Sequence, residues 1–398
     1  MKSKQNFHII WAIAILIIAF AALYLVIGQG FFSHSDYDSY TRQAAAWHSG
    51  QANLPEFVPW LEIARYEGQY FISFQPFPSV VQFALYPIFG MDVPDNLINT
   101  LFAVGALVLI FFTFVRNKFS GVTAAVLALL FVLGSNVFYL SVTGWVWFSA
   151  QVQGFFFSAL CVYLLFSKKK VAWYFAFLSL GIAFACRPFQ IVYFPLALYL
   201  LYRNISEGRG AVKTLAACIK YVLPLVLVGA AVAVYNYIRF ESFIEFGHNY
   251  LPEFASEPQF SLKYIGTNFM EILKLPRIID GELMPPMFNG TLFFLVNPVY
   301  ILLVVSMIRQ KFGAKQLIYL LCLIAHMLLM LSHKTMGGWQ FGSRYLVDMI
   351  PFMAVMIMGD RTLARRSLDD KMPILPIALA AVGIIINLYG AAWFYTIA

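Results

Sequence analysis

The chain has 398 residues, of which 61% are hydrophobic and 12% are charged, and its net charge is +8. A soluble domain cannot bury this much apolar surface around cores of ordinary size, which excludes a soluble globular protein. The positive charge does not indicate a nucleic-acid-binding patch, because it follows the expected membrane topology described below. We therefore expect an integral membrane protein.

Apolar stretches long enough for a helix to cross about 30 Å of hydrocarbon recur along the whole chain. They predict an all-α polytopic membrane protein with a single transmembrane domain over residues 1–398 and about eleven transmembrane helices. The expected spans are residues 9–28, 97–115, 121–141, 149–166, 171–186, 188–202, 215–237, 290–307, 315–332, 344–358 and 373–395. No small-residue cleavage site follows the first span, so we expect a retained anchor and not a signal peptide. The apolar stretch 77–90 contains two prolines, which predicts an interfacial or re-entrant segment.

Lysine and arginine are distributed unevenly between the segments that connect these spans. One side carries 17 of the 27 bases and only four acids, so the positive-inside rule makes that side cytoplasmic. The bases are Lys2, Lys4, Arg116, Lys118, Lys168, Lys169, Lys170, Arg203, Arg209, Lys213, Arg309, Lys311, Lys315, Arg361, Arg365, Arg366 and Lys371, and the acids are Glu207, Asp360, Asp369 and Asp370. The N-terminus is then inside and the C-terminus outside. Two long loops face outward: a first outer loop over residues 29–96 and a second over residues 238–289.

Two carboxylates, Asp36 and Asp38, follow the first span at the point where the chain reaches water. A pair of this kind can act as a catalytic base and its neighbour, bind a metal, or cap the next helix, with Ser35 or Asp36 as the N-cap. On a helix the two side chains project about 200° apart and would not chelate one ion together. Spacing alone leaves capping and catalysis open.

Two arginines, Arg187 and Arg344, lie at the outer ends of expected spans. An unpaired cation within hydrocarbon costs about 2.5 to 3.5 kcal/mol, so both are expected to face a polar cavity or a lipid headgroup. The alternative for Arg344 is an internal ion pair with Asp348, four residues further along one helix face.

Five motifs follow one another along the chain: the acid after the first span, the tract 68–78 (GQYFISFQPFP), the Arg-Pro at Arg187, the tract 235–242 (YNYIRFES) with Glu245-Phe246-Gly247, and the tract 338–345 (GWQFGSRY). Together they resemble bacterial membrane glycosyltransferases of the GT-C superfamily, which includes protein O-mannosyltransferases and the aminoarabinose transferase of lipid A. The resemblance implies a GT-C-like fold with interfacial helices in the first outer loop. It also implies a catalytic carboxylate in that loop and a polyprenyl-phosphate-linked sugar as the donor.

The expected function is transfer of that sugar to a hydroxyl of a lipid, glycan or protein acceptor, on the outer face of the bacterial inner (plasma) membrane. Asp36 or Asp38 would be the general base, with Asp36 preferred because it follows the span most directly; Tyr37 between them departs from the family pattern. Arg344, with Lys334 or Arg187, would stabilise the departing phosphate. The expected substrate contacts are Arg65, Tyr70, Arg239, Glu241 and His248. No cofactor is required and no metal ligands are assigned, although a divalent cation is compatible with the reaction.

Two alternatives stay open at this point. One is a lipid or small-solute transporter or flippase, with the two arginines and Asp348 lining its path. The chain shows no internal repeat of the kind that transporters often have. The other is a glycan ligase or polymerase that uses a lipid-diphosphate donor.

Overall fold

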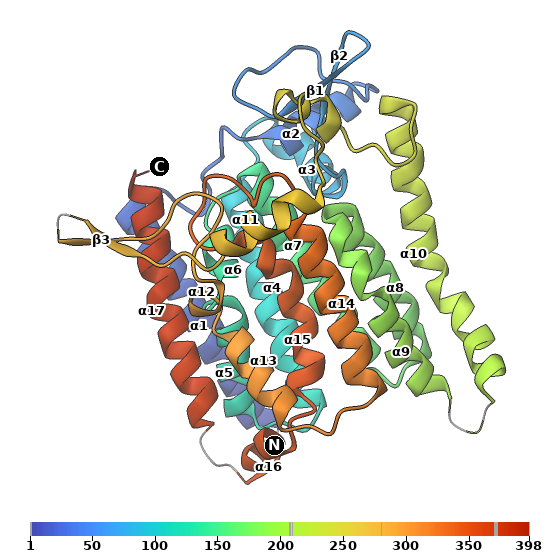
Figure 1. Ribbon diagram of the computed structural model, residues 1–398, viewed down its shortest axis with the longest axis vertical. Helices are drawn as coiled ribbons and strands as arrows, with labels where there is room; N and C mark the ends of the chain where they lie inside the picture. Colours follow the sequence, from blue (N-terminus) through green and yellow to red (C-terminus); the bar gives the residue numbers. More distant parts are fainter. Residues whose placement is uncertain (1, 207, 209, 280, 370–372, 398) are drawn as a thin grey trace.

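The computed structural model describes residues 2–206, 208, 210–279, 281–369 and 373–397, with side chains from Asn6 onward. A bundle of helices carries a layer of shorter elements at one end, and the N- and C-termini lie toward opposite ends of the bundle (Figure 1). Some charges used to predict the topology lie outside the described residues: Glu207, Arg209, Asp370, Lys371 and the side chains of Lys2 and Lys4.

Six helices in the described part of the chain are long and apolar enough to cross a membrane. They are α1 (Lys2–Ile27), α4 (Asp95–Arg116), α7 (Val146–Leu165), α10 (Ala211–Phe240), α14 (Ala314–Leu331) and α17 (Ile374–Ile397). The other five predicted spans fall on shorter helical elements, so the number of crossings stays a prediction. These elements are α5 (Gly121–Val132), α6 (Asn136–Leu140), α8 (Lys170–Cys186), η1 (Pro188–Tyr193), α9 (Phe194–Ile205), α12 (Phe293–Val296), α13 (Val299–Ile308), η5 (Arg344–Met349) and α15 (Ile350–Ile357).

The bundle is held together by close helix contacts. Helix α7 packs against α4, α8 and α15, while α17 packs against α1 and α5. Where α17 passes the end of α5, a Cβ on Gly383 would lie 2.2 Å from the carbonyl oxygen of Gly134. Only glycine allows the two backbones to approach this closely.

We call residues 29–94 and 241–292 the cap, because they form the layer at one end of the bundle (Figure 1). The elements of its first part are α2 (Ser39–His48), β1 (Ile63–Tyr66), β2 (Gln69–Ile72) and α3 (Phe77–Phe89). The elements of its second part are η2 (His248–Tyr250), η3 (Pro252–Phe254), η4 (Leu262–Tyr264), α11 (Ile265–Glu271), β3 (Arg277–Ile279) and β4 (Glu282–Met284). Strands β1 and β2 form an antiparallel hairpin with Ile63 opposite Ile72, and both side chains are buried in a small core that also contains Tyr40 and Val58.

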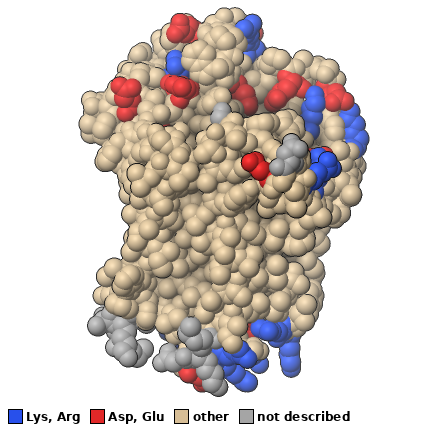
Figure 2. Space-filling model, turned by 90° about the vertical axis from the view of Figure 1, so that its left-hand side faces the viewer, with Lys and Arg blue, Asp and Glu red and all other residues tan. Residues whose placement is uncertain are grey.

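On the face shown in Figure 2, charged side chains gather toward the two ends of the molecule and leave a broad uncharged band between them. The end opposite the cap carries α16 (Arg361–Leu368), on which Arg361, Arg365 and Arg366 are exposed. An apolar band between two charged ends is the pattern expected of a bundle that spans a bilayer. Which end faces the cytoplasm stays a prediction from the distribution of Lys and Arg.

The N-terminus of α2 differs from the expectation that Ser35 or Asp36 would cap it. Asp38 occupies the N-cap position, and its side chain makes no capping hydrogen bond. Its Oδ1 instead accepts a hydrogen bond of 2.7 Å from Nε of Arg42, one turn along the helix. Both partners of this bond are ionised, whereas a capping bond would pair the carboxylate with a neutral backbone N–H.

Candidate active site

One cavity of about 1000 Å³ lies where the cap meets the bundle, and it is enclosed by segments far apart in the sequence. Tyr37, Glu62 and Phe74 of the cap line it together with Trp147 of α7. Several further aromatic side chains complete the wall. A large aromatic cavity with a few convergent charged groups is the usual form of a small-molecule binding site.

Arg344 lines the cavity although only 5% of the residue is exposed. Its Nη1 donates to Oε1 of Gln151 on α7 at 3.3 Å, and its Nε and Nη2 donate to the carbonyl oxygen of Gly337 at 3.3 and 3.1 Å. The amide of Gln151 donates in turn to the backbone oxygen of Arg344 at 2.9 Å. These bonds fix the direction of the guanidinium, and two of its five N–H groups make no hydrogen bond to the described residues and can bind a ligand.

The backbone next to Arg344 requires a glycine. Gly337 has φ +101°, and a Cβ at this position would lie 2.6 Å from Nε of Arg344. The absence of a side chain at Gly337 therefore lets its carbonyl receive the guanidinium.

Arg187 directly follows α8 and is the second cation of the cavity wall. Its Nε lies 3.0 Å from Oδ2 of Asp348, whose side chain is fully buried. The ion pair between Arg344 and Asp348 that was the alternative for Arg344 does not form, because these residues lie on the 3₁₀ helix η5, where side chains four apart point about 120° away from each other. The ring of Tyr345 lies between the two arginines, with its centroid 4.9 Å from Cζ of each.

Glu62 is a half-buried carboxylate of the cavity wall. Its Oε1 accepts a hydrogen bond of 2.8 Å from the indole Nε1 of Trp147, and its other oxygen makes no protein hydrogen bond among the described residues. Burial, together with the negative charge of Glu253, raises the pKa of Glu62 to about 7, against the lowering effects of Trp147 and Arg344. A carboxylate with this pKa can accept a proton near neutral pH.

Two histidines of the cavity wall are held neutral. Burial, assisted by the charges of His333, Arg187 and Arg239, lowers the pKa of His248 to about 3. Burial also lowers the pKa of His333 to about 4, although its Nδ1 contacts the carbonyl oxygen of Thr335 at 2.6 Å. At pH 7 both rings can therefore donate and accept hydrogen bonds without carrying charge.

The cavity brings together three of the residues predicted for the site: Arg344, Arg187 and His248. Lys334, the third predicted phosphate ligand, is not among the lining residues. Its Nζ donates to the carbonyl oxygen of Glu253 and lies 3.5 Å from Oε2 of Glu257.

Four predicted substrate contacts also lie outside the lining. Arg65 and Tyr70 face each other across the β1–β2 hairpin, and Cζ of Arg65 lies 4.0 Å from the ring centroid of Phe57. Arg239 is buried and donates from Nη1 to the carbonyl oxygen of Ile72 at 2.7 Å, which ties α10 to the cap. Glu241 is exposed at the C-cap of α10.

Neither of the two predicted base residues is among the residues that line the cavity. Asp36 is exposed, and its backbone oxygen accepts a hydrogen bond of 3.1 Å from Nε1 of Trp60. Asp38 is buried, with Arg42 at 2.7 Å and Nε2 of His34 at 3.8 Å. Tyr37, between them, does line the cavity, so the two carboxylates lie beside the site; their catalytic role stays a prediction.

Sequence reasoning missed Glu62, Trp147 and Glu253, which line the cavity. Glu62 lies in an ordinary outer-loop sequence, Trp-Leu-Glu-Ile, with no motif around it. The signal that could have drawn notice is an acid directly before an apolar strand. In the part of the chain that the structure describes, no group of three or more His, Cys, Asp or Glu is placed to hold a metal ion.

The fold that positions this cavity is that of the GT-C membrane glycosyltransferases. The crystal structure of ArnT from Cupriavidus metallidurans bound to undecaprenyl phosphate superimposes with a TM-score of 0.54 at 13% identity, covering 92% of this chain and 60% of that chain. The apo state of the same protein gives a TM-score of 0.52 at 15% identity, covering 90% and 60% of the two chains. This chain therefore spans about 60% of the length of the ArnT structures.

The apo oligosaccharyltransferase of Archaeoglobus fulgidus is a more distant match, with a TM-score of 0.48 at 11% identity over 97% of this chain and 56% of that chain. No family model matches the sequence. No curated protein sequence matches it either.

Proposed function

We propose that this protein is a glycosyltransferase that moves a sugar from a polyprenyl-phosphate donor to an acceptor hydroxyl on the outer face of the membrane. The observation that carries the proposal is the pair Arg187 and Arg344 in one aromatic cavity at the end of a GT-C bundle. A phosphate on a lipid carrier needs cations at headgroup depth, with apolar surface beside them for its chain. The ArnT structure with undecaprenyl phosphate adds support, since it has the same fold.

Arg344 is the main phosphate ligand in this proposal. Its two unused N–H groups can bind two phosphate oxygens, and its contacts with Gln151 and Gly337 hold it in place before the donor arrives. Preorganised donors of this kind stabilise the charge that develops on the leaving group without having to reorganise during the reaction. Arg187 shares its charge with Asp348 and would contribute more weakly.

Glu62 is the carboxylate that we assign as general base for the acceptor hydroxyl. It lines the cavity, one of its carboxylate oxygens makes no hydrogen bond to the described residues, its pKa is near neutrality and Trp147 fixes its orientation. In the transfer, the acceptor oxygen forms a bond to the anomeric carbon and the bond from that carbon to the phosphate oxygen breaks. The hydroxyl proton passes to Glu62, and the polyprenyl phosphate leaves as the anion held by Arg344.

The predicted base role of Asp36 or Asp38 is a rival assignment and is tested beside Glu62. The proposal uses arginine in place of a metal ion, so activity should persist in the presence of EDTA. The acceptor class, whether lipid, glycan or protein, is left to the assay below.

The test is turnover by the purified protein in lipid nanodiscs, supplied with undecaprenyl phosphate that carries a labelled sugar and with a membrane extract as acceptor. The wild type should form labelled acceptor, Arg344→Gln should not, and Arg361→Gln on the exposed face of α16 should behave as wild type. Movement of labelled lipid across sealed vesicles without any covalent product would instead support a flippase. Transfer only from a lipid-diphosphate donor would support a ligase or polymerase.

A further inference from the structure

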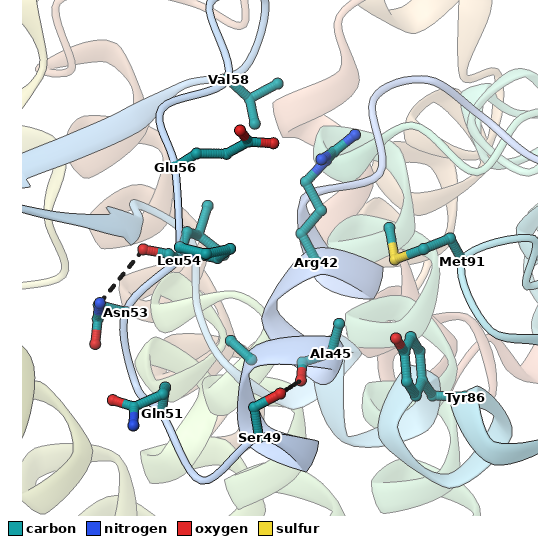
Figure 3. A pocket seen from close by; sticks show the side chains of 12 residues that line it. Arg42, Ala45, Ser49, Gln51, Asn53, Leu54, Glu56, Val58, Tyr86 and Met91 are labelled. Carbon is teal, nitrogen blue, oxygen red and sulfur yellow. Dashed lines mark hydrogen bonds between the residues drawn. The ribbon is translucent and has the colours of Figure 1, made fainter.

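A second and smaller pocket lies in the first part of the cap, between α2, α3 and the loop 51–58 (Figure 3). Its volume is about 270 Å³, just below the usual range of about 300–1000 Å³ for small-molecule sites. This volume suits a ligand of the size of one sugar ring. None of its lining residues is shared with the large cavity.

The floor of the pocket is apolar. Of the lining residues, Ala46, Leu54 and Val58 are buried. Met91 and Tyr86 lie together on one side of the pocket (Figure 3). An apolar floor favours a ligand with a flat C–H face, because contact removes apolar surface from water on both partners.

The polar groups at the rim have unused hydrogen-bonding capacity. The side chains of Arg42 and Glu56 extend toward each other across one end of the pocket (Figure 3). Nε of Arg42 is bound to Asp38 at 2.7 Å, whereas its two Nη atoms make no hydrogen bond among the described residues. The carboxylate of Glu56 and the amide of Gln51 are exposed and likewise make none in the described part of the chain.

The charges of the rim select against ionic ligands. An anion attracted by Arg42 would be repelled by Glu56 and by Asp38, which already pairs with Arg42, and a cation attracted by Glu56 would be repelled by Arg42. A neutral ligand with neighbouring hydroxyl groups can bind both residues. Each hydroxyl can accept a hydrogen bond from the Arg42 guanidinium and donate one to the Glu56 carboxylate. A neutral sugar has such hydroxyls on its edge and a C–H face for the floor.

We propose that this pocket binds one neutral monosaccharide unit. The two sites are separated by a single apolar wall: the small core that supplies Leu54 and Val58 to the pocket also supplies Phe74 and Ala150 to the large cavity. The bound unit is therefore held next to the proposed transfer site but outside it. Binding itself does not depend on the proposed transferase activity.

The test is a binding titration followed by saturation-transfer NMR, with the full-length protein in nanodiscs. The neutral probes are glucose, galactose, mannose and N-acetylglucosamine, and the charged probes are glucuronate and glucosamine. At least one neutral probe should bind with a Kd in the millimolar range, more tightly than either charged probe. Absence of binding by all neutral probes at tens of millimolar would overturn the proposal, and so would tighter binding of a charged probe.

Three variants assign the binding to this pocket. Glu56→Ala removes a hydrogen-bond acceptor and should weaken binding by about tenfold. Ser49→Trp places an indole on the exposed α2 edge of the pocket and should abolish binding. Glu67→Ala, at the exposed turn of the β1–β2 hairpin, is the matched control.

Melting temperatures equal to that of the wild type would show that the variants are folded. If Glu56→Ala and Ser49→Trp bind as the wild type does, the sugar lies elsewhere and the proposal fails. Loss of binding in Glu62→Gln, with normal binding in Glu56→Ala, would place the sugar in the large cavity instead.

Discussion

Arg187 and Asp348 lie 161 positions apart in the sequence and form an ion pair of 3.0 Å between Nε and Oδ2. The pair joins the start of η1 to η5, and Nε2 of Gln190 adds a hydrogen bond of 3.1 Å to the backbone oxygen of Asp348. Asp348 is fully buried, and its ion pair with Arg187 offsets the free-energy cost of removing its negative charge from water. Within the part of the chain that the structure describes, Arg344 is then the cavity arginine without a carboxylate partner.

Asp348→Leu should destabilise the protein strongly, because it leaves the Arg187 guanidinium largely buried without its partner. Loss of one partner of a buried pair costs about 3 to 5 kcal/mol. Thermal unfolding in detergent should show the loss as a lower melting temperature. The double variant Arg187→Met with Asp348→Leu should recover most of the stability, and a double variant no more stable than Asp348→Leu would contradict this account of the pair.

Arg344→Lys should lose nearly as much activity as Arg344→Gln. Lysine keeps the charge but has only three N–H donors on one nitrogen. It cannot bind Gln151 and the carbonyl of Gly337 and still donate two hydrogen bonds to a phosphate. We expect kcat to fall by about 10²- to 10³-fold in both variants, as measured by single-turnover transfer from the labelled donor. Wild-type kcat in Arg344→Lys would show that a positive charge alone is sufficient and that the geometry of the guanidinium is not needed.

Activity should rise with pH around neutrality, because Glu62 must be ionised to accept a proton. Its pKa of about 7 predicts a kcat/KM that increases with pH below 7 and levels off above it. Glu62→Gln should lower kcat/KM by about 10²- to 10⁴-fold and abolish this dependence. Glu67→Gln, an exposed acid of the same hairpin, should reproduce the wild-type profile.

The same assay decides between Glu62 and the two aspartates. If Asp36→Asn or Asp38→Asn abolishes turnover while Glu62→Gln retains it, the base is the aspartate that the sequence predicts. For Asp38 a melting temperature is needed as well, because His34 and Arg42 lose their partner in that variant.

Gly337→Ala should reduce activity through Arg344 and not through the fold. The added Cβ meets Nε of Arg344 at 2.6 Å and also disfavours the φ of +101°, so the guanidinium must move. We expect weaker donor binding, seen as a higher KM, with a smaller change in melting temperature than in Asp348→Leu. Gly338→Ala is the matched control, since it carries a positive φ but meets no neighbour. Equal effects of the two variants would mean that backbone strain, and not Arg344, is responsible.

The apolar pattern of the sequence predicted the helical bundle, and the cost of burying a cation predicted that Arg187 and Arg344 face a cavity. Both inferences depend on local sequence and general energetics. Glu62 could not be predicted this way, because its hydrogen-bond partner Trp147 lies 85 positions away in the sequence. The folding of the cap, which brings the two together, has no local sequence motif. The position of Asp36 and Asp38 after a span predicted a catalytic carboxylate, yet of residues 36–38 it is Tyr37 that lines the cavity.

The proposed function requires the large cavity to receive the phosphate of a polyprenyl-phosphate donor. The most direct measurement is a cryo-EM structure of the protein in nanodiscs with undecaprenyl phosphate. We expect phosphate density within about 3 Å of the Arg344 guanidinium, beside Tyr345, with the prenyl chain leaving the cavity along the bundle. Phosphate density at another site, with Arg344 bound only to Gln151 and Gly337, would contradict the proposed function.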